Sequence, residues 1–166
     1  PRCPWPGNDP LYVAYHDDEW GVPEHDDRAL FEKLVLDGFQ AGLSWITVLK
    51  KRGHYRKAFA NFDVRKVARF DAKKVDALMT NPGVIRHRGK LESVTLNARA
   101  FLGMQEEYGS FARWLWAHVD DKPVVRRSRT PQPSSPLAEK ISKELKRRGM
   151  KFVGPTIIQA YLQAVG

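Results

Sequence analysis

The sequence is poor in cysteine and has no long hydrophobic run. Cys3 is the single cysteine among 166 residues, which excludes an internal disulfide and an iron–sulfur cluster held by four cysteines of this chain. No apolar run approaches the roughly 20 residues that span a bilayer, and no signal-peptide pattern opens the chain. We therefore expect a cytoplasmic protein that does not enter a membrane.

The sequence also lacks the two-residue alternation of apolar and polar side chains that marks β-strands. From Asp26 onward the apolar positions recur with a helical period instead, which predicts an all-α fold. A length of 166 residues fits a single domain over residues 1–166. Capping residues and first-turn prolines predict where helices begin: after Asp26 or Asp27, after Asp63, Asp71 and Ser110, and at Pro136 and Pro155.

The first 25 residues are the exception to this helical pattern. Their prolines break any long helix, so we expect an irregular segment. The same stretch is rich in aromatic side chains, which a disordered tail would not be. We therefore expect it to dock on the core or on a ligand through its aromatic residues, which are Trp5, Tyr12, Tyr15 and Trp20.

Basic residues outnumber acidic ones, 28 to 19, for a formal net charge of +9. The excess gathers in groups within residues 50–57, 86–90, 122–129 and 140–151. Clusters of this kind favour a polyanionic partner, most often nucleic acid. The alternative is a surface whose charge only keeps the protein in solution.

The stretch 37–45 joins two amphipathic segments. Gly38 suits the C-terminal cap of the first helix, and Ser44 suits the N-terminal cap of the second. Asp37 and Trp45 would then lie at the two ends of one short loop, where the carboxylate can accept hydrogen bonds and the indole can stack on a ligand. The alternative is a solvated Asp37 and a Trp45 that only packs in the core.

The stretch 81–90 also lies between two predicted helices. Its Pro82–Gly83 pair forces a turn that Val84 and Ile85 can anchor in the core, and a helix begins near Gly89. The free N–H groups and positive dipole end of such a helix suit a phosphate. The stretch therefore indicates a helix–hairpin–helix grip on the DNA backbone near residues 81–91, or else a plain connection between helices.

Together these stretches resemble the 3-methyladenine DNA glycosylase I family of the helix–hairpin–helix superfamily. The similarity runs in order through essentially the whole chain, from Trp5 through residues 9–23 (DPLYVAYHDDEWGVP), 40–52 (QAGLSWITVLKKR), 85–90 (IRHRGK), 97–100 (NARA) and 146–154 (KRRGMKFVG). The resemblance implies a helix–hairpin–helix glycosylase fold. It also implies a DNA-repair hydrolase of base excision that flips 3-methyladenine out of alkylated double-stranded DNA and cleaves its glycosidic bond.

The resemblance assigns roles to the aromatic residues and to Asp37. Tyr15 and Trp45 would stack on the flipped base, with Trp5 and Tyr12 close by or merely structural. A cationic base over an indole gains about 0.5–2 kcal/mol that neutral adenine does not. Asp37 aligns with the family's pocket glutamate and is the candidate catalytic residue, although its side chain is one methylene shorter. We expect a monofunctional enzyme that leaves an abasic site.

The exposed turns also offer candidate DNA contacts. On the hairpin these are Arg86, His87, Gly89 and Lys90, and Leu43 could wedge into the gap that the flipped base leaves. We expect a monomer. The rival function is a helix–hairpin–helix module that binds DNA without catalysis, in which Asp37, Tyr15 and Trp45 need not share one cavity.

The family carries a zinc site of two cysteines and two histidines, and Cys3 with His16 matches only its N-terminal pair. The other pair would lie beyond Gly166. A structural zinc ion needs four protein ligands, so we expect no cofactor and no metal. The alternative is that a C-terminal tail with two further ligands is missing.

Overall fold

A computed structural model describes residues 1–128 and 130–166. Arg129, in the basic group within residues 122–129, lies outside the described residues. Across the described ranges the secondary structure is helical, and no strand occurs, so the all-α prediction is confirmed. No helix in these ranges combines the length and the apolar composition needed to cross a bilayer.

The helices follow one another as α1 (Pro10–Asp18), α2 (Asp27–Gln40), α3 (Trp45–Leu49), α4 (Arg52–Ala58), η1 (Ala60–Phe62), α5 (Val64–Val67), α6 (Ala72–Leu78), α7 (Arg88–Tyr108), α8 (Phe111–Ala117), α9 (Pro136–Arg147) and α10 (Pro155–Ala164). The predicted starts after Asp63, Asp71 and Ser110 are confirmed, because each of these side chains accepts a hydrogen bond from an N–H in the first turn of its helix. Pro136 and Pro155 open α9 and α10, as expected.

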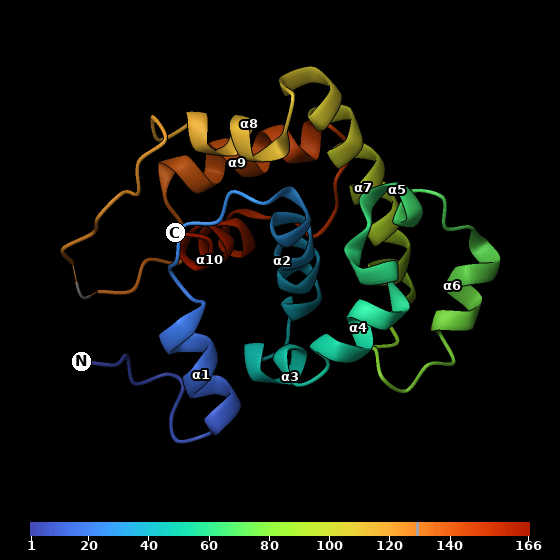
Figure 1. Cartoon of the computed structure of the whole chain (residues 1–166), viewed down its shortest axis with the longest axis horizontal. Helices are drawn as coiled ribbons and strands as arrows, with labels where there is room; N and C mark the ends of the chain where they lie inside the picture. Colours follow the sequence, from blue (N-terminus) through green and yellow to red (C-terminus); the bar gives the residue numbers. More distant parts are fainter. Residues whose placement is uncertain (129) are drawn as a thin grey trace.

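Helix α2 lies at the centre of the molecule, with α10 on one side and α7 on the other (Figure 1). Asp26 caps its first turn by accepting from the Ala29 N–H at 2.9 Å. Asp27 is thereby free to accept from the N–H groups of Phe111 and Ala112, where α8 begins. At the end of the first turn of the helix, the Tyr161 hydroxyl donates to the Leu30 carbonyl at 3.0 Å. These contacts hold α2 in place, and α2 in turn positions the site.

The segment 1–25 is not irregular throughout, because it contains α1. Pro10 stands in the first turn, where a proline costs no hydrogen bond, and Asp9 accepts from the N–H groups of Leu11 and Tyr12. The prediction treated these prolines only as helix breakers and missed this start signal. Docking through aromatic side chains is confirmed, since Tyr15 is only 4% exposed and packs in the core.

The end of α2 also differs from the prediction. The helix continues past Gly38 to Gln40, and the chain turns at Gly42, which has a φ of +79°. Asp37 therefore lies in the last turns of a helix instead of in a loop, which fixes its direction. Ser44 does precede α3, but its hydroxyl is hydrogen-bonded to the Thr47 hydroxyl at 2.7 Å and caps no backbone N–H.

Candidate functional site

The site is built around Asp37, which is 1% exposed. Its Oδ1 accepts a hydrogen bond from Lys33 Nζ at 2.6 Å, one helical turn earlier on α2. Its Oδ2 has no hydrogen-bond partner within residues 1–128 and 130–166. Burial raises the pKa of this carboxyl above its ordinary value, and the Lys33 ammonium opposes that rise. One carboxylate oxygen is thus buried without a protein donor among the described residues.

Two aromatic rings lie over the same ion pair. Lys33 Nζ lies 3.7 Å from the Trp45 ring centroid and 5.7 Å from that of Tyr15. The two ring centroids are 5.3 Å apart, although α1 supplies one ring and α3 the other. Trp45 Nε1 is also buried and has no acceptor among the described residues. The structure therefore brings together Asp37, Tyr15 and Trp45, which the sequence analysis had selected.

Lys33 is the member of this cluster that the sequence analysis missed. Its spacing of four residues before Asp37 is the signal that could have found it, since such pairs meet on one helix face. The contact with Trp45 has no local signal, because it depends on how the turn at Gly42 folds α3 back onto α2.

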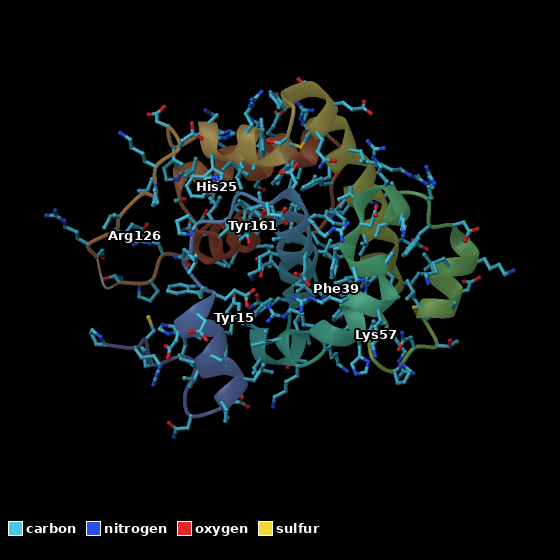
Figure 2. All side chains as sticks on the ribbon, viewed as in Figure 1. Tyr15, His25, Phe39, Lys57, Arg126 and Tyr161 are labelled. Carbon is cyan, nitrogen blue, oxygen red and sulfur yellow. The ribbon has the colours of Figure 1, made fainter. Side chains whose placement is uncertain are left out.

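Trp5 and Tyr12 form the outer part of the aromatic cluster. Their ring centroids are 5.0 Å apart, and Trp5 lies 6.4 Å from Tyr15. Trp5 is 38% exposed, so it stands at the edge of the cluster. Figure 2 shows Tyr15 on α1, on the side toward the rest of the molecule.

A cavity of about 230 Å³ opens beside this cluster. Tyr15, Lys33 and Arg52 line it together with four acidic residues, which are Asp18, Glu19, Glu24 and Glu32. Asp37 and Trp45 do not belong to its described lining. The Lys33 ammonium therefore occupies one face of Trp45, and the same lysine also borders the open space.

The hairpin before α7 packs tightly against α4. The Tyr55 hydroxyl accepts from the Ile85 N–H at 3.0 Å, and Val84 is buried. Gly83 lies so close to His54 that a Cβ there would come within 2.6 Å of the His54 ring. These contacts explain why this turn contains a glycine and how it holds the start of α7 in place.

The first turn of α7 leaves backbone N–H groups open. His87 Nδ1 accepts from the Lys90 N–H at 3.1 Å, while the N–H groups of Arg88 and Gly89 have no acceptor among the described residues. Arg86 is exposed just before this turn. Leu43 is 41% exposed in the turn between α2 and α3.

Lys90 does not point outward, contrary to the prediction that it contacts the DNA backbone. Only 7% of this residue is exposed, and its Nζ donates to the carbonyl oxygens of Phe39 at 3.1 Å and Ala41 at 2.6 Å. These carbonyls lie at the C-terminal end of α2, where helix carbonyls lack intrahelical partners. Lys90 therefore ties α7 to α2 and is not directed toward a ligand.

The residues for a zinc site are present only in part. Cys3 and His16 are close, since His16 Nε2 accepts from the Cys3 N–H at 3.4 Å, and His16 Nδ1 contacts Asp17 at 2.8 Å. Within the described residues no three potential ligands cluster. A four-ligand structural zinc ion does not fit these residues alone.

Comparison with known proteins places the chain in a family. The family model described as "Methyladenine glycosylase" matches residues 5–166. The chain belongs to the methyladenine glycosylase family. It is 47% identical to the DNA-3-methyladenine glycosylase of Haemophilus influenzae, over 99% of this chain and 91% of that relative.

Solved structures of family members share the fold. A crystal structure of 3-methyladenine DNA glycosylase I has a TM-score of 0.96 and 48% identity, and the match covers 100% of this chain and 93% of that one. The Staphylococcus aureus 3-methyladenine DNA glycosylase I, in a structure that concerns 3-methyladenine recognition, has a TM-score of 0.96 and 40% identity, over 99% of this chain and 89% of that one. The methyladenine glycosylase fold thus extends over the whole chain.

Proposed function

We propose that this chain is a DNA-repair glycosylase that removes 3-methyladenine from alkylated double-stranded DNA by hydrolysis and leaves an abasic site. Its family membership and its relatives named DNA-3-methyladenine glycosylase support this function. The observation that carries the mechanism is a buried carboxylate, Asp37, paired with Lys33, whose ammonium lies over the rings of Trp45 and Tyr15.

This arrangement suits a cationic purine. Methylation at N3 of adenine in DNA puts a positive charge on the base, which the indole face and the carboxylate both favour. Oδ2 of Asp37 has no donor within the described residues and can accept from the exocyclic amine of the base. Neutral adenine gains neither the charge attraction nor the cation–π contact.

The chemistry asks little more of the protein. A cationic base leaves easily without a proton from a general acid. Cleavage of the glycosidic bond passes through a transition state in which the sugar resembles an oxocarbenium ion. Asp37 then recognises the base and holds negative charge near the reacting nucleotide, and the phosphates of the DNA add to that field. No obligatory proton transfer is assigned to Asp37.

A lyase step after base removal needs a neutral amine at the sugar carbon. The turn at residues 41–44 contains no lysine, and α7 contains none after Lys90. No amine nucleophile is therefore available on these elements, and we expect the reaction to end at hydrolysis.

The hairpin supplies the DNA-backbone contacts. The open N–H groups of Arg88 and Gly89 suit a phosphate at the start of α7, and Arg86 adds charge beside them. Leu43 is exposed in the turn that joins the helices of Asp37 and Trp45, which suits a wedge into the duplex. One chain carries both sites, so the proposed reaction needs no second copy of the chain.

The test is to incubate the protein with methylated duplex DNA and to identify the released bases. We expect 3-methyladenine with little 7-methylguanine, because the carboxylate selects a purine with an amino donor at C6. Release of 7-methylguanine at a comparable rate would contradict this. Asp37→Asn should lose excision, and Glu106→Gln, at an exposed carboxylate on α7, should keep it. A protein that binds DNA but releases no base would be the rival module without catalysis.

A further inference from the structure

Lys33 occupies the position where the proposed function puts the base. Its side chain is 12% exposed, and its ammonium contacts the Asp37 carboxylate at 2.6 Å and lies 3.7 Å from the Trp45 ring centroid. These are the two interactions assigned above to a cationic base: a charged hydrogen bond to Asp37 and a cation over the indole. A purine ring cannot stack on this face of Trp45 while the ammonium remains there.

We propose that Lys33 is a placeholder cation, which fills the base site in the free protein and leaves it when a flipped cationic base enters. This inference rests on the proposed function, because it needs a cationic base as the incoming ligand. It adds a specificity-determining residue to the site.

The displaced ammonium has a place to go. Lys33 also lines the cavity of about 230 Å³, whose wall includes Asp18 and Glu24. Neither of these has an ion-pair partner among residues 1–128 and 130–166, whereas Glu19 is paired with Arg52 and Glu32 with Arg56. A lysine stem rotates about several bonds, so the ammonium can swing toward these carboxylates while its Cα stays on α2.

The placeholder makes the site selective. When a cationic base displaces Lys33, Asp37 exchanges one cation for another and stays paired. A neutral base would displace the same ammonium and leave a buried carboxylate without a counter-charge, which is strongly unfavourable. Lys33 therefore opposes entry of undamaged adenine more than entry of the methylated base.

The direct test follows the Lys33 side chain by NMR in the wild-type protein. Methylene protons next to an ammonium held over an indole face should resonate upfield of ordinary lysine signals, and the absence of these signals in Lys33→Met identifies them. Saturation with 3,9-dimethyladeninium, a permanently cationic probe, should move them to ordinary positions. Signals that stay upfield with the probe bound, or failure of the probe to bind, would overturn the proposal.

A second measurement compares affinities for neutral 3-methyladenine by calorimetry at mildly alkaline pH. Lys33→Met keeps an unbranched side chain of similar length but removes the competing charge, so we expect binding about tenfold tighter than in the wild type. Lys57→Met is the matched control, since Lys57 is exposed on α4 (Figure 2), and its affinity should not change. Affinity of Lys33→Met equal to or below that of the wild type would contradict displacement.

Excision from methylated DNA by the wild-type protein, run in parallel, separates the two proposals. Release of 3-methyladenine with unmoved Lys33 signals refutes the placeholder and leaves the proposed function standing. Displacement of Lys33 by the probe without release of any base refutes the glycosylase function and supports the placeholder.

Discussion

Two lysines that contact α2, the half-buried Lys33 and the buried Lys90, have different partners. Lys90 donates to the carbonyl oxygens of Phe39 and Ala41, which are the negative end of the helix. Lys33 donates to the carboxylate of Asp37 and lies over Trp45. One ammonium therefore faces backbone acceptors at a helix end, and the other faces side chains that also suit a cationic ligand.

This difference in partners shows why one lysine stays in place and the other can be displaced by a ligand. The proposed reaction brings no ligand to the carbonyls that Lys90 satisfies, so its loss would leave buried acceptors unpaired. The partners of Lys33 gain a new cation when a methylated base arrives, and an acidic cavity can receive the lysine. The same side chain is structural in one place and displaceable in the other.

The largest expected effect is on stability and comes from Lys90→Met. Loss of two charged hydrogen bonds to buried carbonyls should lower the free energy of unfolding by about 3 kcal/mol. Urea denaturation measures this loss, and the folded variant should keep its affinity for free 3-methyladenine. If affinity for the base falls instead while stability is unchanged, Lys90 belongs to the binding site and the contrast between the two lysines is wrong.

Asp37→Asn changes the partner of Lys33 and should lower excision and affinity for the base. It removes charge-assisted hydrogen bonds of about 1.5–3 kcal/mol each, so excision should fall about ten- to several-hundredfold. Affinity for free 3-methyladenine should fall by a similar factor, as single-turnover kinetics and calorimetry would measure. Lost excision with unchanged affinity would instead indicate that the carboxylate acts on the sugar or on a water molecule.

A smaller effect concerns pH. Burial raises the pKa of Asp37 and Lys33 opposes the rise, so Lys33→Met should raise that pKa further. A carboxyl with a higher pKa in the folded than in the unfolded protein binds its proton more tightly when folded. Relative to the wild type, Lys33→Met should therefore lose stability as pH rises from about 4 through the folded-state pKa, by about 1–2 kcal/mol in total.

The measurement for this prediction is thermal or urea unfolding at a series of pH values, with Lys33→Met/Asp37→Asn as the control. The double variant has no carboxyl at position 37, so its stability relative to the wild type should lack that fall. A fall of the same size in the double variant would assign the effect to another group.

The smallest effect comes from Arg86→Gln, which removes an exposed cation beside the hairpin. Arg86 has no ion-pair partner in the described part of the chain. If it neutralises one phosphate, the slope of log affinity for DNA against log salt should fall by about 0.9. Arg65→Gln, at an exposed position on α5, is the control. An unchanged slope for Arg86→Gln would show that Arg86 does not neutralise a phosphate, which contradicts a DNA contact through the hairpin.

Much of the fold could be predicted from local sequence. Asp63, Asp71 and Ser110 were expected to cap helices, and they do, because a capping hydrogen bond involves only residues two or three positions apart. Pro10 carried an equally local signal beside Asp9, and α1 was missed because the proline was interpreted only as a helix breaker. Family resemblance then selected Asp37, Tyr15 and Trp45, which come from three helices.

The sequence by itself determined the all-α class, most helix starts and the residues of the aromatic cluster. Hydrophobic periodicity, helix caps and motifs depend only on residues that are close together in the chain. Only the tertiary structure decided where the two lysines point. Lys90 lies in a basic hairpin motif, yet the packing of α7 on α2 directs it inward to Phe39 and Ala41. Lys33 meets Trp45 because the turn at Gly42 folds α3 back onto α2, and that contact depends on through-space packing rather than on chain spacing.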